Sequence, residues 1–517
     1  MNHLPILPFL IPFVAAILLL LAGRAGLAFK RALTLASILL LIVVAVLLLM
    51  RASEGAILIY RLGNWPPPFG IVLVVDRLSA MMIALTTALS LLAALAAIPG
   101  ADTQGRHFHT LFQLQIAGLN GAFLTGDLFN LFVFFEILLL ASYALLVHGG
   151  GLERTRAALA YAIVNLIGSA LFLIALGLVY GTLGTLTMAD LALVLPKVAE
   201  ADQALVRTAL ALLAVVFVLK AALLPLGLWL PRVYTSALLP VAVLFVIMTK
   251  VGVYALLRVA TIGLAAAPFT LDLLDPWLPW LAIGTIALGS LGALAARRFA
   301  GVIANLVLIS SGTLLLGVAS GSTSARAALL FYLVHTTIVT GALFLLTDAL
   351  SRDRGTLADM VVKGPQLNTT LALGAAFLVL GVAASGVPPL SGFLAKLMLL
   401  QSIRDTSTGL AAWIAVLMSG LVVALVMARA ASVFFWEPGR ASERAEIAPP
   451  VTGIPRDTAM GLRIALVLLV PATLLLTLAA GPVSGYTRAA AEQLAAREAY
   501  VAVLLSRQPP IERMRRP

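Results

Sequence analysis

Cysteine is absent from the 517-residue sequence, and this absence excludes disulfides, thiolate catalysis and cysteine-ligated metals. Histidine is scarce as well, and its scattered positions predict no zinc site: His3, His107, His109, His148 and His335. The sequence also lacks a Walker loop, an HExxH motif and a GxSxG motif. We therefore expect no metal, no nucleotide and no redox cofactor, and any driving energy must come from an ion gradient or a partner.

Charged residues are also scarce in the sequence. Only 11% of residues are charged and 62% are hydrophobic, which is too little charge to cover a soluble domain of this size. The net charge of +12 is spread over short loops, which favours a membrane topology over nucleic-acid binding. An apolar stretch begins almost at Met1 without a basic leader, so it predicts a true span and not a cleaved signal peptide.

Long apolar runs are what the sequence does contain, and they predict an all-α integral membrane protein. A spanning helix needs about 20 mostly apolar residues. By this measure we predict about fourteen spans, near 4–22, 31–50, 72–98, 109–125, 128–147, 157–180, 205–228, 236–258, 277–296, 301–319, 326–349, 368–402, 409–434 and 460–482. The Pro-rich, charged stretch 437–458 predicts a loop, and the tail after about 485 predicts a helix on the membrane surface.

Loop charges predict the orientation. Lys and Arg gather in the loops that follow the odd-numbered spans, which are therefore expected on the cytoplasmic side. Both termini then face outward. The Arg-rich C-terminal tail opposes this assignment, although a surface-lying helix tolerates it.

Two spans contain helix breakers next to a lysine. Pro225 follows Lys220 by five residues in VFVLKAALLPLGLWLP, and Pro388 and Pro389 precede Lys396 in SGVPPLSGFLAKLM. A single such proline is commonly a tolerated kink. Paired breaks separated by five spans indicate an inverted-repeat transporter, in which spans 4–8 match spans 9–13.

Five titratable residues inside the predicted spans are candidates for proton transfer: Glu136, Lys220, Lys250, His335 and Lys396. A central charge costs about 2.5–3.5 kcal/mol on insertion scales, which argues for a role. Only six of the 34 basic residues are Lys, yet three of those six lie in spans. Buried Lys can release its proton whereas Arg keeps it, so these residues predict a proton relay in which Glu136 holds Lys220 protonated.

Each of these residues also has a purely structural interpretation. Glu136 and Lys220 can form a structural ion pair, His335 can bond a neighbouring helix, and Lys250 can bond a carbonyl. Asp127 lies at a predicted span end, where helix capping is the simpler role. Asp76 and Asp348 are also boundary residues.

These residues carry a resemblance to a known family. FFEILLLASYALL with Glu136, LKAALLPLGLWLPRVYTSA with Lys220, and SGVPPLSGFLAKLMLL with Lys396 resemble the antiporter-like subunits shared by respiratory complex I and the multisubunit Mrp-type cation/proton antiporters. The stretch 60–80 (YRLGNWPPPFGIVLVVDRLSA) and the chain length resemble the D-type subunits of the Mrp antiporters in particular.

The resemblance implies fourteen helices with two inverted five-helix repeats, each containing a broken helix. It places Glu136 and Lys220 in one half-channel, Lys250 at the centre, His335 on the eleventh helix and Lys396 in the other half-channel. The implied units are N-terminal helices (1–108), a first repeat (109–260), a second repeat (261–436), and a loop, last helix and surface tail (437–517).

One departure leaves the central route open. Span 10 lacks the His or Lys that some relatives carry, so either Ser310 and Ser311 with water bridge the gap or the route depends on His335.

The function expected from these features is that of a proton-translocating subunit of a multisubunit sodium/proton antiporter in a bacterial inner membrane. It is a secondary transporter, not an enzyme, and its expected partners are other antiporter subunits, lipid, protons and monovalent cations, sodium first; nucleic acid is not expected. One alternative is a proton-pumping subunit of complex I or of a membrane-bound hydrogenase. Another is a structural anchor that moves no ions.

Overall fold

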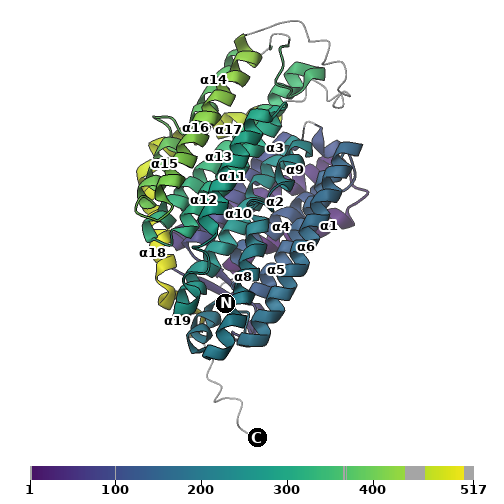
Figure 1. Cartoon of the computed structure of the whole chain (residues 1–517). Coiled ribbons are helices and arrows are strands. Elements are labelled where there is room, and N and C mark those ends of the chain that lie inside the picture. The colour runs from purple at the N-terminus through teal and green to yellow at the C-terminus, as the bar shows by residue number, and fades with distance from the viewer. Residues whose placement is uncertain (1–2, 99, 365–366, 368–369, 437–459, 506–517) are drawn as a thin grey trace.

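The computed structural model describes residues 3–98, 100–364, 367, 370–436 and 460–505. Within these ranges the chain is a bundle of long helices with one small two-stranded hairpin (Figure 1). The helices are α1 (Leu7–Leu21), α2 (Leu27–Ser53), α3 (Arg77–Ala97), α4 (Phe108–Leu124), α5 (Leu128–Val147), α6 (Leu152–Leu183), α7 (Met188–Val194), α8 (Glu200–Lys220), α9 (Trp229–Ser236), α10 (Leu239–Ile262), α11 (Leu278–Ala295), α12 (Phe299–Ala319), α13 (Thr323–Arg354), α14 (Thr370–Ser385), α15 (Ser391–Ser402), α16 (Gly409–Ala431), α17 (Met460–Leu478), α18 (Ala480–Ala495) and α19 (Arg497–Leu505). The hairpin pairs β1 (Leu58–Arg61) with β2 (Val72–Val75) in antiparallel register.

The prediction of a helical, multi-pass membrane protein is confirmed. Eleven of the described helices are long and apolar enough to cross a membrane, or up to twelve if the bent pair α17–α18 counts as one span. Two of the predicted spans are shorter than the about 20 residues that cross a bilayer: α4 has 17 residues, and α14, the first part of the predicted span 368–402, has 16.

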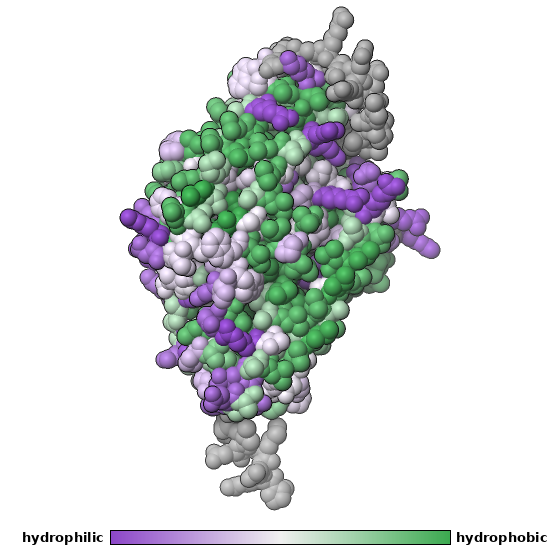
Figure 2. Space-filling view, viewed as in Figure 1, coloured by the Kyte–Doolittle hydropathy of each residue, from purple (hydrophilic) through white to green (hydrophobic). Residues whose placement is uncertain are grey.

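The outer surface of the bundle is apolar. Figure 2 shows a broad hydrophobic area over this face, with hydrophilic residues mostly toward its two ends. Leu140, Leu159 and Leu291 are each more than 60% exposed, which suits contact with lipid and not with water.

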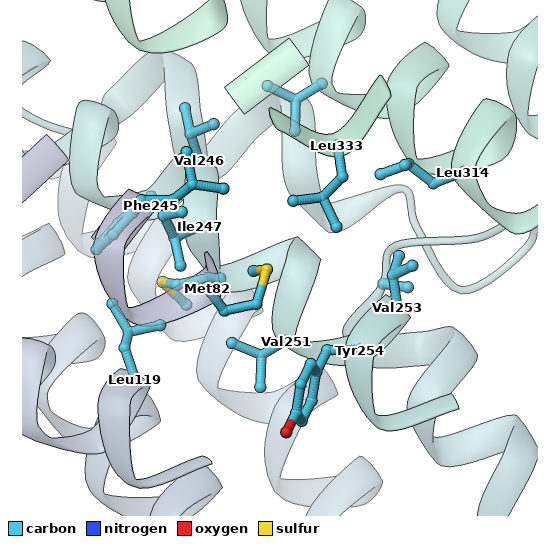
Figure 3. Packing of buried hydrophobic residues seen from close by; sticks show 14 of the residues in the cluster. Met82, Leu119, Phe245, Val246, Ile247, Val251, Val253, Tyr254, Leu314 and Leu333 are labelled. Atoms are coloured by element: carbon cyan, nitrogen blue, oxygen red, sulfur yellow. The ribbon is translucent and has the colours of Figure 1, made fainter. Parts of the chain in front are cut away.

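The core of the bundle is formed by α10, α12 and α13. In the most apolar stretch of each of these helices, 94% of the residues are buried. Figure 3 shows Val246 and Val251 of α10 packed among side chains of neighbouring helices, including Met82 of α3 and Leu333 of α13. Lys250 of α10 and His335 of α13 lie within this buried core.

Both predicted helix breaks are present. The predicted span 205–228 overlaps α8, which ends at Lys220, and the following turns lead to α9. The predicted span 368–402 contains α14 and α15. Proline explains each break, since Pro225 and Pro389 cannot donate a backbone hydrogen bond and crowd the preceding turn. A third break was not predicted: α17 and α18 meet at an angle of 77°.

The predicted start of the third span at residue 72 is wrong. Residues Val72–Val75 form strand β2, and helix α3 begins at Arg77. The boundary is fixed by Asp76, whose side chain accepts a hydrogen bond from Ser79 N (2.9 Å) while Ser79 Oγ accepts one from Asp76 N (2.8 Å). This reciprocal capping box starts a helix and ends the strand before it.

Loops that follow even-numbered spans meet at one end of the bundle. Gly126 N donates to Val72 O and Leu128 N donates to Leu186 O, both at 2.9 Å. These bonds connect the segments after the second, fourth and sixth predicted spans.

Loops that follow odd-numbered spans meet at the opposite end. Arg31 Nε donates to Asp102 Oδ2 at 2.6 Å, and Arg154 Nε donates to Ser236 O at 3.2 Å. The alternation on which the predicted orientation depends is therefore present in the structure.

The tail after residue 485 packs against protein. Helix α18 lies along α13, and Gln493 Oε1 accepts a hydrogen bond from Arg77 N at 2.9 Å. Arg497 of α19 donates to Ala265 O, at the end of the bundle where the even-numbered loops meet. The predicted loop 437–458 and the last part of the tail, 506–517, lie outside the described residues.

Candidate functional site

Glu136 lies on α5, half-buried, and is bonded to the neighbouring helix α6. Ser169 Oγ of α6 donates a hydrogen bond to Glu136 Oε1. No ion pair within 4.0 Å joins Glu136 to Lys220 among the described residues, so the ion pair of the structural interpretation is not seen there. The carboxylate of Glu136 accepts a hydrogen bond from the hydroxyl of Ser169 instead.

Lys220 is 4% exposed and turns toward the same helix, α6. Its Nζ donates to Asn165 Oδ1 at 3.2 Å and lies 5.8 Å from the centre of the Phe135 ring. Asn165 and Ser169 are four residues apart, so they lie on one face of α6. This face therefore connects Glu136 and Lys220 through an amide and a hydroxyl.

A small cavity lies beside Lys220. It is lined by Tyr161, Asn165, Trp229 and Met248, and its volume of about 10 Å³ suits roughly one water molecule. Water at this position has polar partners in the amide, the ammonium and the phenol. The break after Lys220 thus lies next to space that a proton-carrying water can use.

Lys250 is fully buried at the centre of α10. Its Nζ donates to Ser310 Oγ of α12 at 3.1 Å and to Thr249 Oγ1 at 3.4 Å. The partners are hydroxyls and not the carbonyl that the structural interpretation of this residue invoked. Figure 3 shows the apolar side chains of Val246 and Val251 on the same helix.

His335 of α13 is 3% exposed and is bonded across the second helix break. Its Nδ1 lies 2.9 Å from Ser391 Oγ, the first residue of α15. Lys396 of α15 is 8% exposed, and its Nζ donates to Ser385 O, the last residue of α14, at 2.8 Å. The cation therefore lies at the partly negative C-terminus of a helix, which favours positive charge.

His335 and Lys396 share a cavity. Tyr332, Thr336 and Thr340 also line it, and its volume is about 20 Å³, enough for one or two waters. The structure thus brings these two predicted residues together, as it does Glu136 and Lys220 through α6.

Two further hydroxyls lie near the central positions. Ser311 Oγ and Thr337 Oγ1 are buried and have no hydrogen-bond partner among the described residues. Ser311 follows the Ser310 that binds Lys250, and Thr337 lies two residues after His335. Buried hydroxyls normally find a partner, so each of these two hydroxyls suits an ordered water.

Sequence reasoning placed Asp76 and Asp348 at span ends and missed their buried ion pairs; Asp348 lies inside α13, before its end at Arg354. Arg258 of α10 and Asp76 form an ion pair, Nη2 to Oδ1 at 2.6 Å, with both side chains at most 4% exposed. Asp348 is also buried on α13 and pairs with Arg352 at 2.9 Å. Glu136 is therefore not the only acidic residue enclosed by the bundle. The predicted cap at Asp127 is confirmed, since it accepts from Asn130 N at 2.8 Å.

The sequence matches a family model described as "NADH:quinone oxidoreductase/Mrp antiporter, TM" over residues 125–422. This match covers more than half of the chain and includes all five predicted relay residues. The chain belongs to this NADH:quinone oxidoreductase/Mrp antiporter family.

Relatives within the family agree over nearly the whole length. The chain is 40% identical over 530 aligned residues to the D subunit of a probable K(+)/H(+) antiporter of Rhizobium meliloti, covering 96% of each chain. It is 34% identical to the D subunit of the Na(+)/H(+) antiporter of Alkalihalophilus pseudofirmus, covering 98% of this chain and 100% of that one. A chain in the solved Mrp complex of Dietzia sp. DQ12-45-1b superposes with a TM-score of 0.84 at 28% identity, over 98% of this chain and 100% of that one.

Proposed function

We propose that this NADH:quinone oxidoreductase/Mrp antiporter family member is the proton-translocating membrane subunit of a multisubunit monovalent cation/proton antiporter. The observation that carries the proposal is the set of groups within the bundle that can exchange protons, each bonded to a hydroxyl, an amide or a carbonyl. The names of the relatives, antiporter D subunits, support antiport over enzymatic activity.

The proposed route begins at Glu136 and passes Lys220, Lys250, His335 and Lys396 in that order. An ionised Glu136 stabilises the ammonium form of Lys220, so protonation of the carboxylate changes the proton occupancy of the lysine. Asn165 and Ser169 then belong to the route as the polar groups between these two residues.

The central part of the route is assigned to hydroxyls. Ser310 would bridge the gap on α12, since it accepts a bond from Lys250. Ser311 and Thr337 would hold the water that continues toward His335. The proposed route therefore combines the two alternatives that the sequence left open for this region. Hydroxyls on α12 with water carry the proton part of the way, and the imidazole of His335 on α13 carries it further.

We extend the proposal to the architecture. Fourteen membrane helices in two inverted five-helix repeats, over 109–260 and 261–436, are supported by the broken helices α8–α9 and α14–α15. An N-terminal unit of 1–108 and a C-terminal unit of 437–517 flank these repeats. A location of both termini on the outer side of a bacterial membrane is supported by the Lys and Arg in the odd-numbered loops.

Sodium remains the first cation to test, and potassium the second, because relatives carry both names. The experiment is cation-driven dequenching of a ΔpH probe in vesicles that contain the whole complex, with Na⁺ and K⁺ added separately. Antiport with either ion supports the proposal. Copurification with dehydrogenase subunits, together with no antiport, would instead support a redox-driven pump, which the family description also includes.

A further inference from the structure

The two helix breaks are held in the same way by hydroxyls from other helices. At the first break, Leu224 N donates to Thr285 Oγ1 of α11 at 2.9 Å. At the second break, Ser391 N donates to Thr477 Oγ1 of α17 at 2.9 Å. An amide can only donate, so in each case the threonine oxygen is the acceptor.

Each threonine completes its bonding identically. Thr285 Oγ1 donates to Leu281 O at 2.7 Å, and Thr477 Oγ1 donates to Thr473 O at 3.3 Å, both four residues earlier on their own helix. The hydroxyl hydrogen is thereby directed along the threonine's helix and a lone pair toward the break. Two breaks 167 positions apart in sequence (224 to 391) carry one arrangement.

The freed amides need this acceptor. Where a helix is interrupted within a membrane, its unpaired backbone groups must be satisfied by protein or by water in a cavity. Leu224 N lies four residues after Lys220, and Ser391 Oγ is itself the partner of His335 Nδ1. A hydroxyl that fixes these amides therefore also fixes the approach to a relay residue.

We propose that Thr285 and Thr477 are positioning residues, a pair of hydroxyl latches that hold the two breaks so that Lys220 and His335 keep their relay geometry. This inference rests on the proposed function. It assigns a role to α11 and α17, the helices that directly follow the first and second proposed repeats. Thr477 is two residues before the 77° bend into α18, so the latch also couples the C-terminal helices to the second break.

The test uses the whole complex carrying Thr285→Val or Thr477→Val, which keep the volume and remove the acceptor. Each variant should lower the antiport rate roughly tenfold, less than the ~100-fold that a 1 Å misplacement of reacting groups can cause. Thr285→Ser and Thr477→Ser keep the oxygen and should restore the rate. Thr473→Val is the matched control, because Thr473 is buried on the same helix and its hydroxyl bonds only Leu469 O, at 3.1 Å, among the described residues.

A second measurement is independent of transport. Amide hydrogen exchange of the peptides containing Leu224 and Ser391 should speed up roughly tenfold in the corresponding Val variants, because a bonded amide loses its acceptor. Unchanged exchange would overturn the latch, and faster exchange with parental antiport would overturn its positioning role. If Glu136 variants show that the proposed relay is wrong, the exchange rates still test whether Thr285 and Thr477 hold the amides of Leu224 and Ser391.

Discussion

Lys220 can be a proton carrier or a structural partner, and the two roles require different properties of its side chain. Lys220 is 4% exposed and its ammonium is bonded to Asn165, while Glu136 is bonded to Ser169 on the same face of α6. A structural role requires only the positive charge. A carrier must also be able to lose its proton, which Lys does and Arg does not.

We expect Lys220→Arg to be nearly as damaging as Lys220→Ala, with antiport below about a tenth of the parental rate, since Arg stays protonated at any working pH. The measurement is the initial rate of cation-dependent ΔpH dissipation at matched protein levels. A Lys220→Arg complex that exchanges cations at close to the parental rate would leave a structural role as the better explanation of this residue.

Ser169→Ala removes the hydroxyl that donates to Glu136, a bond to a charged group worth about 1.5–3 kcal/mol. We expect the antiport rate to fall roughly tenfold, and Ser169→Thr to restore most of it. Thr182→Val on the same helix is the control, since Thr182 bonds only carbonyls of its own helix among the described contacts. Equal rates in the Ala variant and the control would remove Ser169 from the route.

The five titratable residues could be selected as candidates because an ionisable side chain inside an apolar run is conspicuous in one sequence. Asn165 and Ser169 could not be selected in the same way, since uncharged polar residues are frequent in membrane helices. Their importance depends on contacts with Lys220 and Glu136, which are 55 and 33 positions distant in the sequence. A polar pair spaced by four within YAIVNLIGSALF was the available signal.

Helix breaks are predictable at the scale of the element, because proline acts locally. The bend between α17 and α18 has the same kind of signal, which sequence reasoning missed: Pro482 follows LAAG directly and has no N–H to donate to Leu478 O. The start of α3 was placed too early because VLVV is as apolar as a span. Only the capping box at Asp76 and the pairing with β1 distinguish the strand Val72–Val75 from the start of a membrane helix.

Asp76 fixes more than the start of α3. Its ion pair with Arg258 connects α3 to α10, and Arg258 lies 5.9 Å from the ring of Tyr500 on α19. Removing one partner of a buried pair leaves the other charge uncompensated, at a cost of about 3–5 kcal/mol. We therefore expect Asp76→Asn to lower the thermal denaturation temperature of the purified complex clearly, or to reduce its assembly.

The matched comparison is Asp272→Asn, which breaks the exposed pair with Arg207 (2.7 Å). Exposed pairs contribute about 0–1 kcal/mol, so this variant should behave like the parent. Similar denaturation temperatures for the Asp76→Asn and Asp272→Asn complexes would show that the buried pair does not hold the bundle together.

The whole molecule offers a proton route but no evident cage for a cation. Among the described residues no group of three or more His, Cys, Asp or Glu side chains is placed to hold a metal ion. The D subunits it resembles are named as parts of antiporters, and the Dietzia chain belongs to a complex. We expect this chain purified alone into liposomes to show no cation-dependent proton movement, whereas the assembled complex shows it. Full antiport by the isolated chain would count against the assignment as one subunit of a larger machine.

Glu136→Gln in the assembled complex is the sharpest test of the proton route, because it removes the one acidic residue of the proposed relay and keeps the shape of the side chain and one acceptor oxygen. The measurement is the antiport rate in vesicles, with Na⁺ and with K⁺, beside copurification of the partner subunits. We expect antiport to be lost with both ions while the complex stays assembled. Antiport at the parental rate in a fully assembled Glu136→Gln complex would show that protons do not pass through this carboxylate.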